Sequence, residues 1–168
     1  FTRSAHREAV SCHEQALDAL THLPKTPKTL EQAVDLRLGL RNSLFPLGEV
    51  EAGLRHLREA EPVARALDDQ RRLGLILAYL SEHARLTGQS ADAVASAQNV
   101  QTIAKALGDL PLTVAANYYL GTAYLAAGAY RSAVEFCGKT IEPLEGDLDR
   151  ERFGLAGFPV VMGRVFGA

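Results

Sequence analysis

The chain has 168 residues, of which 47% are hydrophobic, so it is long enough to form one domain with a continuous core. It carries 18 Lys and Arg against 20 Asp and Glu, and this formal net charge of −2 argues against nucleic acid and anionic membranes as partners. The sequence contains no uninterrupted apolar run as long as a membrane-spanning helix, so no membrane association is expected.

The composition and periodicity are those of helices, with abundant Ala and Leu and no Trp. A polar, proline-rich loop is expected over 23–28, and a longer charged connection over 145–157. Pro62 lies inside one expected helix, where it should remove a backbone hydrogen bond and kink the helix. The helices expected in chain order span 4–22, 29–47, 50–67, 70–87, 91–107, 110–127, 130–144 and 158–168.

Glycines recur about every 40 residues, at Gly48, Gly88 and Gly128, and each can end a helix in the left-handed conformation. A second turn recurs between them, and its last residue is an Asp that can cap the next helix. The sequence therefore predicts an all-α fold, an α-solenoid of antiparallel helix pairs in a single domain over 1–168. Partial repeats are expected at both ends, around three full repeats over about 29–68, 69–108 and 109–146.

The third repeat has large and small residues at the positions of a known helical repeat: Leu120, Gly121, Tyr124, Gly128, Tyr130 and Ala133. This pattern resembles the tetratricopeptide repeat. Gly121 and Ala133 are expected to face each other across two helices, with Tyr124 and Tyr130 filling the space around them. The earlier repeats have Arg41 and Ser81 where the pattern has glycine. A HEAT-type array, whose usual period is nearer 40, is the alternative.

Six segments carry a closer resemblance: 29–33, 35–37, 57–61, 69–74, 115–121 and 150–157. They resemble bacterial multidomain signalling proteins that combine a class III nucleotide cyclase or similar catalytic domain, an AAA-type ATPase and a C-terminal tetratricopeptide region. The resemblance implies a non-catalytic module for protein–protein interaction or regulation, associated with an adenylate or guanylate cyclase. The alternative is an effector- or peptide-sensing repeat domain of a bacterial regulator.

Catalytic and cofactor motifs are weak in this sequence, so no enzyme, cofactor or metal site is expected. Segment 133–140 fits a relaxed phosphate-binding pattern, but within a helix its N–H groups are already bonded, and Glu135 would repel phosphate. His6 and His13 lie about two helical turns apart, too far to share one metal ion. Arg71 and Arg72 stand among acidic residues and are interpreted as solvated residues at a helix end.

A binding groove is expected on the concave side of the repeats, which the first helix of each pair lines. The mixture of inward positions is amphipathic and nearly neutral, and Arg41 and Asn42 with Arg85 are the nearest thing to a polar anchor. Its expected occupant is a protein or peptide, including neighbouring domains of the same parent chain; otherwise these residues only solvate the surface. The expected groove residues are Asp35, Leu38, Asn42, Phe45, Glu82, Arg85, Tyr118 and Thr122.

The sequence starts at Phe1 within an expected helix and stops in an apolar segment, so it is interpreted as a fragment of a longer chain. Cys12 and Cys137 are too few for a disulfide framework and are expected to be reduced thiols of a cytoplasmic protein.

A homodimer contact is expected through four apolar residues, Phe158, Val161, Val165 and Phe166.

Overall fold

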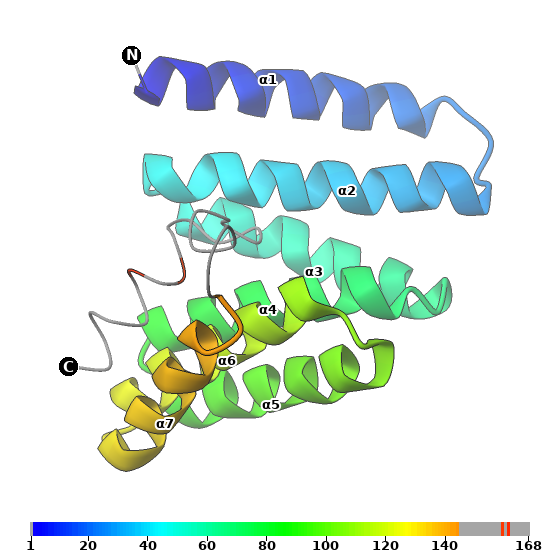
Figure 1. Ribbon diagram of the computed structural model, residues 1–168. Helices are drawn as coiled ribbons and strands as arrows, with labels where there is room; N and C mark the ends of the chain where they lie inside the picture. Colours follow the sequence, from blue (N-terminus) through cyan, green and yellow to red (C-terminus); the bar gives the residue numbers. More distant parts are fainter. Residues whose placement is uncertain (1, 145–158, 160, 162–168) are drawn as a thin grey trace. The chain divides into compact units, whose positions relative to one another are not determined.

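The computed structural model describes residues 2–144, 159 and 161. Within this part the chain is all-α, as predicted, with no strand (Figure 1). No helix in it has the length and apolar character needed to cross a membrane. The elements are α1 (Thr2–Thr21), α2 (Pro27–Leu44), the 3₁₀ turn η1 (Phe45–Leu47), α3 (Val50–Ala66), α4 (Gln70–Leu86), α5 (Ser90–Leu107), α6 (Leu110–Ala126) and α7 (Tyr130–Ile141).

The predicted helices agree with these bounds to within a few residues. The helix expected over 29–47 ends at Leu44 and finishes as the 3₁₀ turn η1, because Pro46 has no N–H to continue the α-helical ladder. α3 includes Pro62 and continues to Ala66. The connection predicted over 145–157 lies outside the described residues, as does the helix predicted over 158–168 except for Pro159 and Val161, which are helical.

The chain divides into two compact units, Phe1–Ile76 and Leu77–Ala168, and α4 begins in the first and ends in the second. In the first unit α2 packs against both α1 and α3; in the second, α6 packs against both α5 and α7 (Figure 1). Each unit thus has one central helix flanked by its two neighbours in sequence. The single domain over 1–168 stays a prediction.

The three glycines at 40-residue spacing form the same turn each time. Gly48, Gly88 and Gly128 have φ of 82°, 78° and 75°, which is the left-handed region, so the predicted helix-ending role is confirmed. Each glycine N–H donates to the carbonyl three residues earlier, and the next N–H donates to the carbonyl five residues earlier. An L-residue at any of the three positions would adopt this conformation only with strain.

The second kind of turn also recurs, between α3 and α4 and between α5 and α6. Asp68 and Gly108 have φ of 52° and 62°, and the aspartate that follows each one begins the next helix. Asp69 Oδ1 accepts from the backbone N–H of Arg72 at 3.0 Å, and Asp109 Oδ1 from that of Leu112 at 2.9 Å. The predicted caps at these two aspartates are therefore confirmed, and the third, Asp147, lies outside the described residues.

The most buried helix is α6, which has eleven buried residues between Leu112 and Ala123. A helix that is apolar on all faces is buried on all faces, which fits its central position between α5 and α7. The first unit has a comparable core around Leu40 of α2 and Leu57 of α3, each at most 2% exposed. Full burial of a leucine side chain contributes about 1.5–3 kcal/mol, so such residues stabilise the packing of each helix against its neighbours.

Helices α6 and α7 approach each other closely at Gly121. A Cβ atom added there would lie 2.8 Å from Cys137 Sγ and 3.5 Å from the Ala133 carbonyl oxygen, so the predicted facing of Gly121 and Ala133 is confirmed. Tyr124 stacks on Phe136 with ring centroids 5.6 Å apart. The predicted packing role of Tyr130 is wrong: it is the first residue of α7 and is 67% exposed.

The other two repeats fill the corresponding contact differently. Where the third repeat has Gly121, the second has Ser81, whose hydroxyl donates to the Ala93 carbonyl at 2.8 Å. The first has Arg41, and it faces Gly53, at which an added Cβ would lie 3.5 Å from Arg41 Cγ. The larger side chain on one helix is thus matched by the smaller one on its neighbour, which keeps the contact close in every repeat.

Candidate functional site

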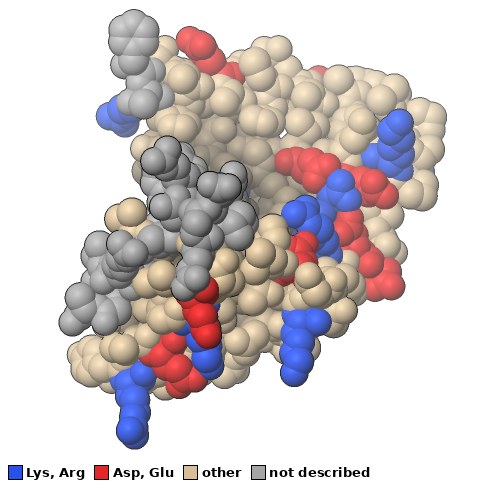
Figure 2. All heavy atoms as spheres, in the orientation of Figure 1, with Lys and Arg blue, Asp and Glu red and all other residues tan. Residues whose placement is uncertain are grey.

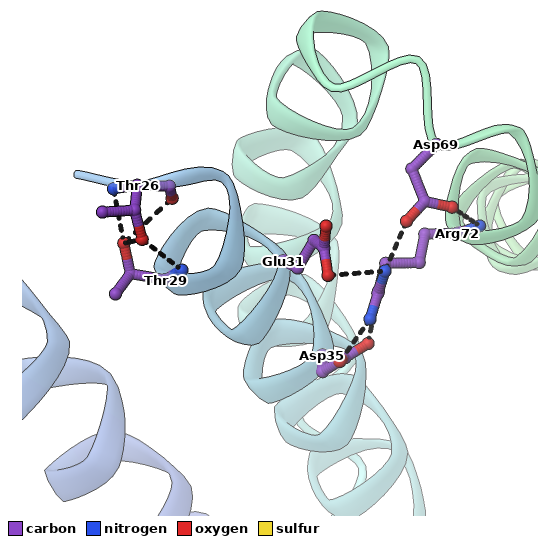
Figure 3. A network of polar contacts seen from close by, with 6 residues as sticks. All are labelled: Thr26, Thr29, Glu31, Asp35, Asp69 and Arg72. Carbon is purple, nitrogen blue, oxygen red and sulfur yellow. Dashed lines mark hydrogen bonds and ion pairs between the residues drawn. The ribbon is translucent and has the colours of Figure 1, made fainter.

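Arg72 lies at the centre of a charged cluster in the first unit, here called the Arg72 cluster and made of Glu31, Asp35, Asp69 and Arg72 (Figure 3). Its Nε and Nη2 donate to the two carboxylate oxygens of Asp35, both at 2.7 Å, and its Nη1 pairs with Asp69 and lies 3.8 Å from Glu31. The bidentate contact with Asp35 depends on the planar guanidinium, which distinguishes arginine from lysine.

Arg72 is at a helix end, as interpreted from the sequence, but it is wrong that the residue is merely solvated there. Arg72 lies in the first turn of α4, and its partner Asp35 lies on α2, 37 residues earlier in the sequence. Glu31 and Asp35 are one turn apart, so they share the face of α2 that meets Arg72. A contact over this sequence distance depends on how α2 and α4 pack, which local sequence patterns do not encode.

Two helix caps place the charged residues of the cluster. Thr26 and Thr29 form a reciprocal capping box that starts α2 (Figure 3). Asp69 precedes α4 and accepts from the backbone N–H of Arg72 while it also pairs with the Arg72 guanidinium. The start of each helix is thereby fixed one or two turns from the carboxylates and the guanidinium that must meet.

The electrostatics of the cluster favour the charged forms of its members. Burial would raise the pKa of Asp69, but hydrogen bonds from the Arg72 backbone and guanidinium outweigh it and hold the pKa below its ordinary value. The hydrogen bond with Asp35 raises the pKa of Arg72, so the guanidinium stays charged at any physiological pH. On the face shown in Figure 2, acidic and basic side chains of the described residues lie side by side, without a broad area of one sign.

The charge on Asp69 should make stability depend on pH in the acid range. Because the folded-state pKa is lowered, its contribution is present above the ordinary pKa of aspartate and is lost as pH falls through the folded-state value. Asp69→Asn keeps a good N-cap but removes the charge, so we expect it to unfold more easily than wild type by about 1–2 kcal/mol at pH 7. Urea unfolding at several pH values should show this difference closing below about pH 4; a gap that widens in acid would contradict the assignment.

The predicted groove residues of α2 and η1 differ in their exposure. Asp35 belongs to the Arg72 cluster, and Leu38 is buried, so neither presents a free side chain to a partner. Asn42 is exposed, and its Oδ1 accepts from Arg41 Nη1 at 3.1 Å. The Arg41 guanidinium lies 4.6 Å from the centre of the partly buried Phe45 ring. Arg41 therefore holds Asn42 and Phe45 in one arrangement, although it is itself almost fully buried.

The predicted groove residues of the second unit come together around Tyr118. Burial raises the pKa of Tyr118 to about 12, the negative charge of Glu82 adds to the rise, and the positive charge of Arg85 opposes it. Glu82 and Thr122 are buried, and Arg85 is partly exposed. Glu82 and Arg85 of α4 thus lie near enough to Tyr118 of α6 to influence its charge. Of these predicted groove residues, however, only Arg85 keeps appreciable exposure to solvent.

The relaxed phosphate-binding pattern over 133–140 lies within α7, and so its predicted helical conformation is confirmed. Lys139 forms an ion pair with Glu135 one turn earlier, and its ammonium lies 4.7 Å from the centre of the Phe136 ring. Among the described residues, no group of three or more His, Cys, Asp or Glu side chains is arranged to hold a metal ion.

A cavity of about 440 Å³ lies between α1, α2 and α3, and sequence patterns did not indicate it. We call it the first-unit cavity. Its apolar lining is only partly buried, and its charged lining residues, Lys25 and Arg37, are both cations. Because three helices and the loop before α2 must meet to form it, no local signal could have predicted it. The lining residues are Leu17, Leu20, Thr21, Lys25, Thr29, Leu30, Ala33, Arg37 and Val63.

The two cysteines should react at very different rates. Cys137 is 1% exposed, and burial raises the pKa of its thiol, so both access and thiolate formation are suppressed. Cys12 is exposed on α1. We expect a disulfide reagent such as DTNB to modify one thiol of the native chain rapidly and the second only on unfolding. Cys12→Ser should remove the fast phase; two fast thiols in the native protein would contradict the packing of Cys137.

No model of a known protein family matches this chain, and no curated protein matches it significantly. The resemblance to tetratricopeptide regions of bacterial signalling proteins stays a prediction.

Proposed function

We propose that the chain is a tetratricopeptide-like helical-repeat module that binds a protein or peptide partner, or neighbouring domains of its own parent chain, in a bacterial signalling protein. The observation that carries the proposal is the recurrence of one turn geometry about every 40 residues, at Gly48, Gly88 and Gly128. Repeated helix pairs of this kind provide extended surfaces for partners. The α-solenoid arrangement is part of the proposal, with a HEAT-type array as its alternative.

The side chains best suited to meet a partner are those of the first helices that keep some exposure. Asn42 and Phe45 are held together by Arg41, and Arg85 lies near Tyr118. Arginine and tyrosine are enriched among the residues that contribute most to binding energy, and phenylalanine is enriched in protein interfaces. The contacts already made by Arg41 reduce the conformational entropy that Asn42 and Phe45 would lose on binding.

The proposal assigns the chain no catalysis and no cofactor, a cytoplasmic location, and association with a nucleotide cyclase or AAA-type ATPase in the same parent chain. A homodimer contact through Phe158, Val161, Val165 and Phe166 also belongs to it. Of these four residues only Val161 lies in the described part of the chain, and its side chain is largely exposed.

Site-specific photo-crosslinking in the parent protein tests the partner surface. A benzophenone side chain replaces Asn42 on α2, and in a matched variant it replaces Arg58, which is exposed on α3, the second helix of the same pair. We expect position 42 to crosslink to one defined segment, identified by mass spectrometry, in a neighbouring domain or a second protein. Equal crosslinking from positions 42 and 58, or none from position 42, would count against the proposed surface.

A further inference from the structure

We infer that the first-unit cavity is a binding site for a small aliphatic carboxylate, with the hydrocarbon chain on its leucines and the carboxylate at Arg37. This site goes beyond the proposed partner surface and does not depend on it, since the two share no residue. Three observations carry the inference: the size of the cavity, the partly exposed apolar lining, and the sign of the lining charges.

The size and lining of the cavity favour a small molecule. Its volume of about 440 Å³ lies in the range of small-molecule pockets, and helices α1, α2 and α3 border it. Leu17, Leu20, Leu30 and Val63 are all partly exposed, so apolar surface there remains in contact with water. An aliphatic chain of about ten carbons would cover this surface, and burying each methylene contributes about 0.8 kcal/mol.

The polar groups of the lining favour an anion. The hydroxyl of Thr21 donates to the Asp18 carbonyl, and that of Thr29 donates within the turn before α2, so both are used locally. The lining contains two cations, Lys25 and Arg37, and no carboxylate. A neutral or cationic head group would therefore find no complementary charge there, whereas a carboxylate would find two.

Arg37 is placed to accept such a head group. Its Nη1 donates to the Ala33 carbonyl at 3.3 Å, which folds the guanidinium back along α2 toward the cavity. Its Nε donates to Glu59 at 3.2 Å, and no described residue bonds its Nη2. Because the Glu59 side chain is 57% exposed, this ion pair is weak and can share the guanidinium with a ligand carboxylate.

Two substitutions should change the affinity for decanoate in opposite directions. Arg37→Gln should weaken the binding of decanoate about tenfold, because it removes a charge-assisted hydrogen bond. Glu59→Gln should strengthen it about threefold, because it removes a competitor for Arg37 and a repulsive charge. Arg65→Gln is the matched control, since Arg65 is exposed on α3, pairs with Glu61 one turn away and does not line the cavity.

Isothermal titration calorimetry of the chain with decanoate, and with decanol as the neutral analogue, tests the site. We expect saturable 1:1 binding of decanoate, at least tenfold weaker binding of decanol, and no effect of Arg37→Gln or Glu59→Gln on decanol. Ala33→Leu should fill the cavity and abolish both signals while far-ultraviolet circular dichroism stays unchanged.

Several outcomes would overturn the inference. They are the absence of saturable decanoate binding, equal affinity for decanoate and decanol, or decanoate binding that Arg37→Gln and Glu59→Gln leave unaltered. The Glu59 side chain is 57% exposed and that of Arg37 is 20% exposed, and neither substitution enlarges the side chain, so these two variants keep the test decisive even if Ala33→Leu does not fold. A peptide with a C-terminal leucine that displaces decanoate at much lower concentration would assign the cavity to a peptide instead. If position 42 gave no crosslink, the proposed partner surface would be contradicted, but the decanoate-binding results would be unaffected.

Discussion

Gly121→Val is expected to lower the free energy of unfolding by about 3 kcal/mol, the largest effect of any single substitution considered for this chain. An added Cβ would lie 2.8 Å from Cys137 Sγ and 3.3 Å from the Cys137 backbone nitrogen. The thiol can turn aside, but the backbone nitrogen can move only if α6 and α7 separate. Urea denaturation followed by circular dichroism measures the loss.

Gly53→Ala is the matched control, because Gly53 is also a buried glycine that faces a neighbouring helix. An added Cβ would lie 3.5 Å from Arg41 Cγ, which is an ordinary contact, and the other repeats have Ala93 and Ala133 at this position. Alanine also has the better helix propensity, so we expect Gly53→Ala to stabilise the chain by about 0.5–1 kcal/mol. If both glycines respond alike, the close approach at Gly121 is not what limits substitution there.

A second substitution can separate the two obstacles at Gly121. In the Gly121→Ala background, Cys137→Ala removes the nearest atom, Sγ, and leaves the backbone nitrogen in place. We expect this double variant to lose less stability than the sum of the two single variants, because the residues are in contact. Strict additivity would show that the thiol contributes nothing to the cost.

Arg72→Met is expected to lower the free energy of unfolding by about 2 kcal/mol, because it leaves Glu31, Asp35 and Asp69 close together without their shared cation. The Asp35 side chain is 55% exposed, and solvent screening there keeps the expected loss below that of a fully buried pair. Arg72→Lys should recover less than half of the loss, because an ammonium cannot bond both oxygens of Asp35 at once.

Arg65→Met is the control for a local ion pair, since Arg65 contacts Glu61 one turn away on the same helix. Such pairs contribute about 0.3–0.5 kcal/mol, so its effect should be several-fold smaller than that of Arg72→Met. Hydrogen exchange should locate the Arg72→Met loss in the first turn of α4 and the facing part of α2. Similar losses for both variants would show that the Arg72 cluster contributes no more than a surface pair.

Sequence patterns located the helices well because the signals that end and begin them are local. A left-handed glycine such as Gly128 and a capping aspartate such as Asp109 act within a few residues of themselves. The facing of Gly121 and Ala133 was also predictable, because the third repeat has large and small residues at the positions of a known helical repeat. The exposure of Tyr130 was not predictable, since the same spacing in the sequence is compatible with a side chain that points into solvent.

The features that sequence patterns missed depend on distant contacts. Arg72 meets Asp35 only because α2 and the first turn of α4 are neighbours in the fold. The first-unit cavity needs the meeting of Leu20, Arg37 and Val63 from three helices. The predicted groove residues Glu82 and Tyr118 are both buried, and their burial depends on packing that the repeat pattern does not specify.

Because α4 begins in one compact unit and ends in the other, the chain cannot be divided at the boundary without breaking a helix. A cut after Ile76 would leave the first half with a stub of about seven residues and the second half with about ten, both shorter than helices that persist alone in water. Fragments intended to isolate either half should each carry a complete copy of Gln70–Leu86, and limited proteolysis at this junction should be slow.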